Sequence, residues 1–244
     1  MIQIHRFYID QVNGETALLT DSAQLHHLKD VIRLKVDDEV NVSDAAGNDY
    51  TGVITAIGKK QAEIKVQKKL PVPGTSPKLT LACAVPKGSR LDEAIDHLTQ
   101  LGVECIIPMQ TERGVVKLDD ARADARLERW RKIAQSAARQ SQQARITAIA
   151  PVTSLADVVH NSKNYDLKLI PHLTGERRTL KEVINAARPQ NIIVLIGPEG
   201  DFTPAEVKLA LDNGFLAVSL GETVLRVVTA AVAAASYIKL ASGN

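Results

Sequence analysis

Two glycine-bearing loops carry the residues best suited to bind a ligand. The apolar run 192–196 ends at 197–200, Gly-Pro-Glu-Gly, and a second apolar run, 215–220, ends at Gly221. Both runs have the composition of buried strands, and in open α/β sheets ligands bind outside the carboxyl ends of the strands. The loops therefore predict a ligand site at one edge of a sheet. The alternative for 197–200 is a plain strand-to-helix turn.

The loop at 197–200 matches none of the common phosphate-binding motifs. No G-x-G-x-x-G follows a predicted strand and no Walker motif occurs, but the backbone amides could hydrogen-bond a purine edge or a carboxylate. The sequence also has no G-x-S-x-G, no Cys–His motif and no obvious carboxylate pair. This favours a reaction in which a cofactor supplies the reactive group and the protein supplies positioning.

Arg226 is the only charged residue between Glu222 and Lys239, and it stands at the start of a helix predicted over 226–241. An arginine there is costly unless it is paired or binds an anion, which makes Arg226 a candidate for anion contact; an exposed arginine is the alternative. The helix is apolar on nearly every side. Such a helix is buried on every side, and a second subunit is the expected cover.

The segment 113–145 is basic. It holds nine Lys and Arg residues against four Asp and Glu residues, which leaves 9 − 4 = +5, with Trp130 in the middle. A solvated helix face is the usual explanation of a charge run, but the one-signed excess favours contact with phosphates. The whole chain carries a net charge of only +2, so any nucleic-acid binding must come from such a local patch.

Composition argues against a metal site and a membrane span. The six histidines lack metal-ligand spacing, and Cys83 and Cys105 lie in apolar runs, as expected of small buried residues in a reducing compartment. The N-terminus has no signal-peptide run, and the apolar C-terminal stretch is too short for a transmembrane helix. A soluble cytoplasmic protein without a metal or a membrane is expected.

The chain divides into two predicted domains. Residues 1–70 alternate polar and apolar side chains between turns, which predicts a small antiparallel sheet or barrel with one short helix over 23–32. The Pro-rich segment 71–78 predicts a linker. Residues 79–244 alternate strands and helices, which predicts an α/β domain with a mostly parallel sheet. It includes a charged helix over 119–143 and a helix that begins with the capping box Thr203-Pro204-Ala205-Glu206.

Several motifs together resemble one known family. LIGPEGDF at 195–202 and the stretch from Gly214 to Ala231 are similar to the C-terminal signature of the ribosomal RNA small subunit methyltransferase E family, within the SPOUT superfamily of knotted methyltransferases. The segments 26–34, 86–90, 112–117 and 129–134 resemble the same family in the same order along the chain.

The resemblance implies a PUA-like RNA-binding β-barrel over 1–70 and a SPOUT domain over 79–244, with a deep trefoil knot within about 166–244. It also implies S-adenosyl-L-methionine as cofactor and a homodimer formed through the apolar C-terminal helix. The implied reaction is methylation of N3 of a uridine in the decoding region of 16S rRNA, with the small ribosomal subunit as partner.

The same resemblance assigns site residues. The expected catalytic residues are Arg226 and Glu199. The cofactor would contact Ile170, Pro171, Ile196, Gly197, Pro198, Glu199, Gly200, Leu220, Gly221, Val224 and Leu225. The expected RNA contacts are Arg6, Arg33, Lys87, Arg90, Arg113, Lys117, Arg129 and Lys132.

The chain departs from the family pattern beside the second loop. Val227 and Val228 replace a threonine and a carboxylate, and Asp201 replaces the last glycine of GPEGG. Uridine N3 must lose a proton before methyl transfer, so Arg226 is expected to stabilise the resulting N3 or O4 anion. Two alternatives remain: a non-catalytic RNA-binding or ribosome-assembly protein that keeps the fold, and a SPOUT methyltransferase with another RNA target.

Overall fold

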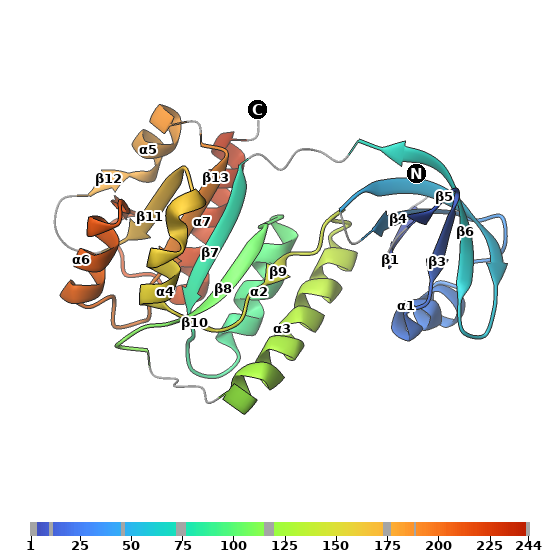
Figure 1. Ribbon diagram of the computed structural model, residues 1–244, viewed down its shortest axis with the longest axis horizontal. Coiled ribbons are helices and arrows are strands. Elements are labelled where there is room, and N and C mark those ends of the chain that lie inside the picture. The colour runs from blue at the N-terminus through green and yellow to red at the C-terminus, as the bar shows by residue number, and fades with distance from the viewer. Residues whose placement is uncertain are drawn as a thin grey trace. The chain divides into compact units, whose positions relative to one another are not determined.

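The computed structural model describes residues 4–9, 12–44, 47–71, 77–114, 120–172, 177–187 and 189–242. The chain forms two compact units, which Figure 1 shows as ribbons. The first unit contains Met1–Gly74 and Arg139–Arg145, and the second contains Thr75–Ala138 and Ile146–Asn244. Of the predicted linker 71–78, residues 72–76 lie outside the described part of the chain.

The first unit is built on a six-stranded sheet with the strand order β1-β4-β5-β6-β3-β2. Alternate residues point into its core, as Ala62 and Ile64 of one strand and Ala17 and Leu19 of its neighbour do. All pairs are antiparallel except β1 with β4, which is parallel and was not predicted. The strands are β1 His5–Ile9, β2 Val12–Asn13, β3 Thr16–Leu19, β4 Glu39–Asp44, β5 Asp49–Ile57 and β6 Ala62–Leu70.

The helix predicted over 23–32 is not one regular helix. It consists of α1, Ser22–His26, followed directly by a π-helical turn, His27–Val31. The Asp21 side chain accepts a hydrogen bond from the Gln24 amide at 2.8 Å, which begins the helix. The wider π-helical turn still directs Leu28 into the core beside Leu25.

Arg6 corrects one of the predicted RNA contacts. Its side chain is only 9% exposed and forms an ion pair with Asp49, whose side chain is 6% exposed. The Arg6 guanidinium also donates to Ser43 Oγ at 2.8 Å, and Ser43 Oγ donates to Asp49 at 2.9 Å. Because its charge is buried and already paired, Arg6 acts as a structural residue of this unit and not as a surface contact for phosphate.

The second unit contains a parallel sheet with the order β10-β8-β7-β13-β11-β14-β12, and β9 pairs with β8. Every pair in it is parallel, which confirms the predicted sheet type. The strands are β7 Lys78–Ala84, β8 Cys105–Gln110, β9 Ala148–Ile149, β10 Thr153–Ser154, β11 Leu167–Pro171, β12 Arg178–Thr179, β13 Asn191–Ile196 and β14 Leu216–Ser219.

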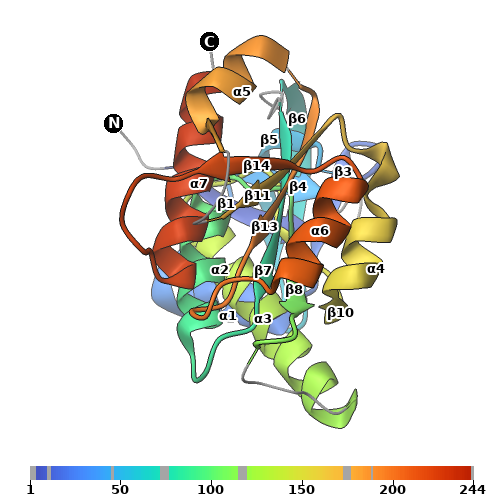
Figure 2. The same cartoon turned by 90° about the vertical axis from the view of Figure 1, so that its left-hand side faces the viewer.

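Helices cover both faces of this sheet, as the edge-on view in Figure 2 shows. On one face α2, α5 and α7 share a core with Leu79, Leu81 and Ile192, and on the other α4 and α6 share a core with Ile193 and Leu195. Strands buried on both faces must be apolar throughout, which explains the uninterrupted run of β13. The helices are α2 Arg90–Gln100, α3 Asp120–Gln140, α4 Leu155–His160, α5 Leu180–Ala187, α6 Pro204–Asp212 and α7 Val227–Ser242.

Three neighbouring strands end at the same edge of the sheet. β11 lies between β13 and β14 and is parallel to both. The chain therefore runs from β13 through α6 and crosses past β11 to reach β14. This crossing lies within the stretch where the family resemblance implies a knot, and the knot itself stays a prediction.

The charged helix α3 ends earlier than predicted. It stops at Gln140, and Gln142 adopts a left-handed conformation with φ of 56°, which breaks the helix. The segment that follows packs with the first unit, where the Tyr8 hydroxyl donates to the Gln143 carbonyl at 2.7 Å. Helical periodicity continues through this segment, so the sequence did not predict this return to the first unit.

The C-terminal helix α7 is buried on one face only. Ala231, Ala234 and Ile238 are inside the core, whereas Leu240 is 81% exposed and Tyr237 is partly exposed. Among the described residues, no helix has both the length and the apolar character that crossing a membrane requires.

The buried Arg6–Asp49 pair gives a stability test. Arg6→Met should lower the free energy of unfolding by about 3–5 kcal/mol, because the Asp49 charge then stays buried without a partner. Combining Arg6→Met with Asp49→Leu removes both charges and should recover most of the loss. Urea titrations followed by circular dichroism measure both effects. A double variant no more stable than Arg6→Met would show that the unpaired charge is not the cause.

Candidate functional site

A cleft lies at the sheet edge where β11, β13 and β14 end. Nine of the eleven residues predicted to contact a cofactor line it: Pro171, Ile196, Gly197, Pro198, Glu199, Leu220, Gly221, Val224 and Leu225. Ile170 is instead fully buried in the core behind the cleft, and Gly200 is exposed outside it. The cleft is completed by residues that the sequence did not single out: His172, Arg177, Asp201, Thr223 and Ala230.

Gly197 allows the first loop to turn tightly against the core. A Cβ atom at this position would lie 3.0 Å from Cε2 of the buried Phe202 ring, so any larger residue would displace that ring. The turn that follows is closed by a hydrogen bond from the Asp201 amide to the Pro198 carbonyl at 3.0 Å. The loop thus exposes backbone to the cleft on one side and is packed by an aromatic ring on the other.

The N-terminus of α6 clamps this loop. The predicted capping box is confirmed: Thr203 Oγ1 accepts from the Glu206 amide, and the Glu206 carboxylate accepts from the Thr203 amide at 2.8 Å. The same buried carboxylate accepts from the Glu112 amide at 2.8 Å, and Thr203 Oγ1 donates to Glu112 at 3.0 Å. These bonds tie the segment after β8 to the start of α6.

Arg113, predicted as an RNA contact, adds to the same clamp. Its guanidinium donates to the carbonyl of Gly200 at 2.8 Å and to that of Phe202 at 3.4 Å. The backbone carbonyls of the loop are therefore held by a charged donor, which gives stronger hydrogen bonds than a neutral one.

Glu199, one of the two predicted catalytic residues, is engaged in an ion pair. Arg90, a predicted RNA contact, donates to Glu199 at 2.7 Å, and both side chains are partly exposed. This pair joins the first residue of α2 to the cleft loop. The structure brings Arg90 and Glu199 together, a contact that the sequence did not indicate.

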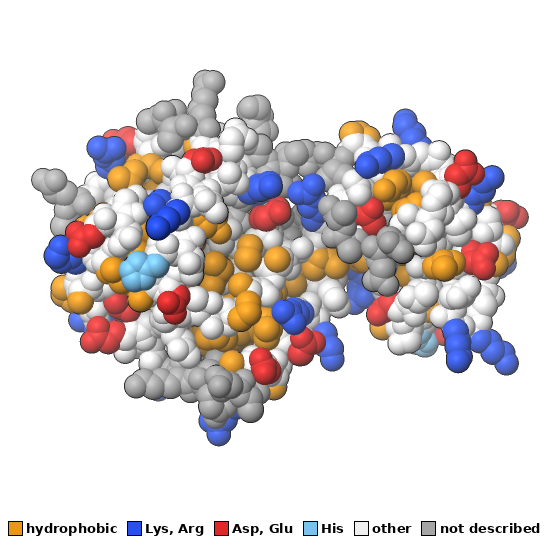
Figure 3. All heavy atoms as spheres, viewed as in Figure 1, with side chains coloured by type: hydrophobic (Ala, Val, Ile, Leu, Met, Phe, Trp, Pro, Cys, Tyr) orange, Lys and Arg blue, Asp and Glu red, His pale blue; other side chains and the backbone are white. Residues whose placement is uncertain are grey.

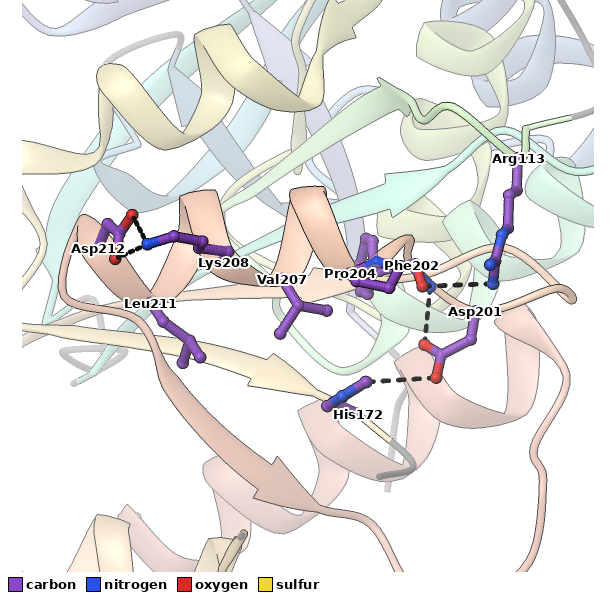
Figure 4. Close-up of a pocket in the computed structure, with 9 residues that line it drawn as sticks. All are labelled: Arg113, His172, Asp201, Phe202, Pro204, Val207, Lys208, Leu211 and Asp212. Carbon is purple, nitrogen blue, oxygen red and sulfur yellow. Dashed lines mark hydrogen bonds and ion pairs between the residues drawn. The ribbon is translucent and has the colours of Figure 1, made fainter. Parts of the chain in front are cut away.

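A second cleft, drawn in Figure 4, shares lining residues with the first. His172 and Asp201 line both clefts, and the Nδ1 atom of His172 lies 3.3 Å from the Asp201 carboxylate. The remaining lining residues include the apolar side chains of Val207 and Leu211 on α6. No sequence motif marked His172, because its partner lies far along the chain and only the fold brings them together.

The other predicted RNA contacts are spread over the surface. Arg33, Lys87 and Lys132 are exposed, while Arg129 pairs with Asp92, which also accepts from the buried Trp130 indole at 2.9 Å. Lys117 lies outside the described residues. On the face in Figure 3, the described Lys and Arg side chains of each unit are interspersed with Asp and Glu.

Arg226 directly precedes α7, and its side chain is exposed. Its neighbour Leu225 lines the cleft, while Arg226 itself does not. Val227 is buried and Val228 packs against the core, so the two valines fill space at the start of the helix. Within the described ranges, no group of His, Cys, Asp and Glu residues is arranged to hold a metal ion.

Comparison with known families agrees with this architecture. The RNA methyltransferase domain family matches residues 74–239, and the RNA methyltransferase PUA domain family matches residues 19–67. The fold, the cleft and these matches define an α/β RNA methyltransferase that carries a PUA domain.

Comparison with individual relatives identifies the family within this class. The chain is 31% identical over 231 residues to the ribosomal RNA small subunit methyltransferase E of Mycobacterium bovis, which covers 93% of this chain and 88% of that one. It is 33% identical over 238 residues to the protein of the same name from Synechocystis, which covers 94% and 74% of the two chains. This chain belongs to the ribosomal RNA small subunit methyltransferase E family, which confirms the resemblance seen in the sequence.

A solved structure of high similarity carries a ligand. The crystal structure of a ribosomal RNA small subunit methyltransferase E from Neisseria gonorrhoeae, bound to S-adenosyl methionine, superposes with a TM-score of 0.86. The two sequences are 28% identical, and the alignment covers 98% of each chain.

The clamp at α6 predicts that removing the Thr203 hydroxyl lowers stability and loosens the loop 197–202. Thr203→Ala should cost about 1–2 kcal/mol of stability, because it removes the helix cap and the bond to Glu112. It should also speed amide hydrogen exchange of 197–202. Thr179→Ala is the matched control, since Thr179 forms a similar reciprocal cap with Glu182 at the start of α5 and, within the described part of the chain, its side chain bonds to no other loop. Equal exchange in the two variants would contradict the clamp.

Proposed function

We propose that this protein transfers a methyl group from S-adenosyl-L-methionine to N3 of a uridine in the decoding region of 16S rRNA. The observation that carries the proposal is the cleft at the ends of β11, β13 and β14, in a chain of this family whose solved relative binds that cofactor. The small ribosomal subunit is the proposed partner, and the cytoplasm is the proposed site of action.

The residues of the cleft fit the cofactor. Gly197 and Gly221 present backbone without a side chain, and Ile196, Leu220 and Leu225 supply apolar walls. Backbone amides and carbonyls can hydrogen-bond an adenine edge, while the apolar walls pack against its faces and exclude water. When bound, the cofactor supplies an electrophilic methyl group.

The protein then has to favour the uridine anion. Loss of the N3 proton leaves negative charge on N3 and O4, and a positive group near these atoms lowers the barrier. We assign this role to Arg226, because Leu225 lines the cleft and Arg226 is the adjacent residue with an exposed guanidinium. Glu199 is assigned to the cofactor cleft, where Arg90 holds its carboxylate.

A homodimer is proposed through α7. Its outer face exposes Leu240 and Tyr237, and Val224, 72% exposed, lies just before the helix. Large apolar side chains exposed along one helix favour a protein–protein contact. The same contact would place a second subunit beside the cleft, because α7 begins at the cleft.

Methyl transfer onto 30S subunits that lack this modification tests the proposal. The wild-type protein should methylate one uridine at N3, located by mass spectrometry of the RNA. Absence of transfer despite cofactor binding would support a non-catalytic RNA-binding protein instead. Transfer to another nucleotide would support a different RNA target.

Arg226→Ala should lower kcat by about 10²–10³-fold, the usual effect of removing one group that stabilises a developing anion. Cofactor affinity measured by calorimetry should stay within about threefold, because Arg226 does not line the cleft. Lys163→Ala, another exposed basic residue of the second unit, is the control. Full activity of Arg226→Ala would show that Arg226 does not stabilise the uridine anion.

A further inference from the structure

The segment 31–36 of the first unit exposes apolar and basic side chains together. Val31 is 60% exposed and Val36 is 48% exposed, and Arg33 and Lys35 lie between them in the sequence with exposed side chains. The other two side chains of the segment pack against the core of the unit: Ile32 and Leu34. The segment is therefore anchored from within and presents the rest of its side chains to the outside.

Hydrogen bonds hold this segment in one conformation. The Leu34 amide donates to the Leu28 carbonyl at 3.0 Å, and the Lys35 amide donates to the Asp38 carboxylate at 2.6 Å. The segment begins at the last residue of the π-helical turn, and such turns are frequent at functional sites. A surface that is already ordered loses little conformational entropy when it binds a partner.

Arg33 is held in a strained backbone conformation. Its φ of 62° lies in the left-handed region, which glycine adopts more cheaply than any other residue. Among the residues that the structure describes, the Arg33 guanidinium has no ion pair or hydrogen bond that would compensate for this strain. Strain of this kind gathers at functional sites. An arginine in this conformation indicates a partner outside the unit.

The hairpin turn between β5 and β6 adds two lysines to this surface. Lys29 Nζ donates to the Gly58 carbonyl at 2.9 Å, which joins the π-helical turn to the hairpin turn, and the exposed Lys59 and Lys60 follow Gly58. In Figure 1, α1 and the loop between β5 and β6 lie at the same end of the unit, and Lys and Arg side chains project from that end in Figure 3. We refer to six side chains as the tip surface: Val31, Arg33, Lys35, Val36, Lys59 and Lys60.

The basic side chains of the tip surface are not neutralised by the unit itself. Within the described ranges, none of the four forms an ion pair. The acidic run 37–39 lies beside Val53 and Ile54, about 10 Å before β5 ends. Asp30, within the π-helical turn, pairs with His26 at 2.6 Å. The tip surface therefore combines available positive charge with exposed apolar side chains.

RNA is the partner that this chemistry fits. Lys and Arg bind phosphate oxygens without reading sequence, while apolar side chains pack against sugars and the faces of unpaired bases. We propose that the tip surface binds the rRNA substrate through its phosphodiester backbone, with Val31 and Val36 against sugars or base faces. This rests on the proposed function, because it takes the substrate to be RNA. The tip surface gives the first unit an RNA contact that the buried charge of Arg6 does not provide.

Charge removal at the hairpin turn tests the phosphate contact. Lys59→Gln combined with Lys60→Gln, in the full-length protein, should weaken binding to a fluorescent fragment of the 16S rRNA decoding region by roughly tenfold at about 0.1 M salt. The slope of log affinity against log salt should become shallower by about 1.4, since each phosphate contact with single-stranded RNA contributes about 0.7. Fluorescence anisotropy at several salt concentrations measures both quantities.

Lys65→Gln combined with Lys68→Gln is the matched control. It removes the same charge from exposed positions farther along β6, outside the tip surface. Its affinity and salt slope should stay close to those of the wild type. Equal losses in the two double variants would show a general effect of charge and overturn the proposal.

Arg33→Gly separates binding from folding. It removes the guanidinium and relieves the left-handed backbone, so the melting temperature should not fall, while the salt slope should become shallower by about 0.7. A lower melting temperature with an unchanged slope would show that Arg33 stabilises the unit and does not contact RNA.

Val31→Ser combined with Val36→Ser tests the apolar contact. Affinity for the RNA fragment should fall by about three- to tenfold, because less apolar surface is removed from water on binding. The salt slope should stay that of the wild type, since no charge changes. Unchanged affinity would overturn the apolar part of the proposal.

Methyl transfer onto 30S subunits gives an independent readout. The variant with Lys59→Gln and Lys60→Gln should raise KM for the subunit by roughly tenfold and leave kcat and cofactor affinity within about twofold, because neither lysine lines the cofactor cleft. A fall in kcat at unchanged KM would overturn the proposal. Weaker binding to the subunit with unchanged binding to the RNA fragment would show a ribosomal protein as the partner and overturn it as well.

The outcomes distinguish the two proposals, because RNA binding is measured without methyl transfer. A wild-type protein that binds the fragment through the tip surface but does not methylate uridine N3 overturns only the proposed function. A wild-type protein that methylates uridine N3, with all tip variants binding RNA as the wild type does, overturns only the tip surface.

Discussion

The site depends on the parallel alignment of three strands in the second unit. β11 has β13 on one side and β14 on the other, and all three run in the same direction. Their carboxyl ends are therefore neighbours although the strands are well separated in sequence. Helices on both faces keep the alignment, because they bury Ile192, Val194 and Ile196 on one side and Ile193 and Leu195 on the other. Most residues of the cleft lie at these strand ends or in the loops that follow them.

One buried carboxylate, that of Glu206, also fixes the position of two loops beside the cleft. Glu206 caps its own helix and also binds the backbone of Glu112, so the loop after β13 and the segment after β8 are held by the same side chain. Arg113 extends this contact to the carbonyls of Gly200 and Phe202. A flexible Gly-Pro loop thus becomes a fixed wall for the cleft. The cap of α6 and the fixed shape of the cleft wall are two results of one hydrogen-bond network.

Local patterns in the sequence predicted the helices and strands. Features that depend on contacts between distant residues could not be predicted in this way. Apolar runs and the capping box at Thr203 indicated strands and helix starts, because these depend on neighbouring residues. The cleft loops were predictable from the strands that end in them. The burial of Arg6 and the pairing of His172 with Asp201 could not be predicted, because the partner of each side chain lies about 30 or more residues away in the sequence. The early end of α3 also escaped prediction, since its helical periodicity continues past Gln140.

The return of residues 139–145 to the first unit has a consequence for how the protein can be divided into fragments. Residues 139–145 belong to the first unit although both of their flanks belong to the second. The first unit is therefore not one continuous stretch: a fragment that stops at Gly74 lacks the carbonyl of Gln143 that receives the Tyr8 hydroxyl. Cleavage within 72–76 would yield two polypeptides that both contribute to the first unit. The N-terminal polypeptide would supply its sheet, and the C-terminal polypeptide would supply residues 139–145. Such a protein is a natural candidate for reassembly from complementary fragments.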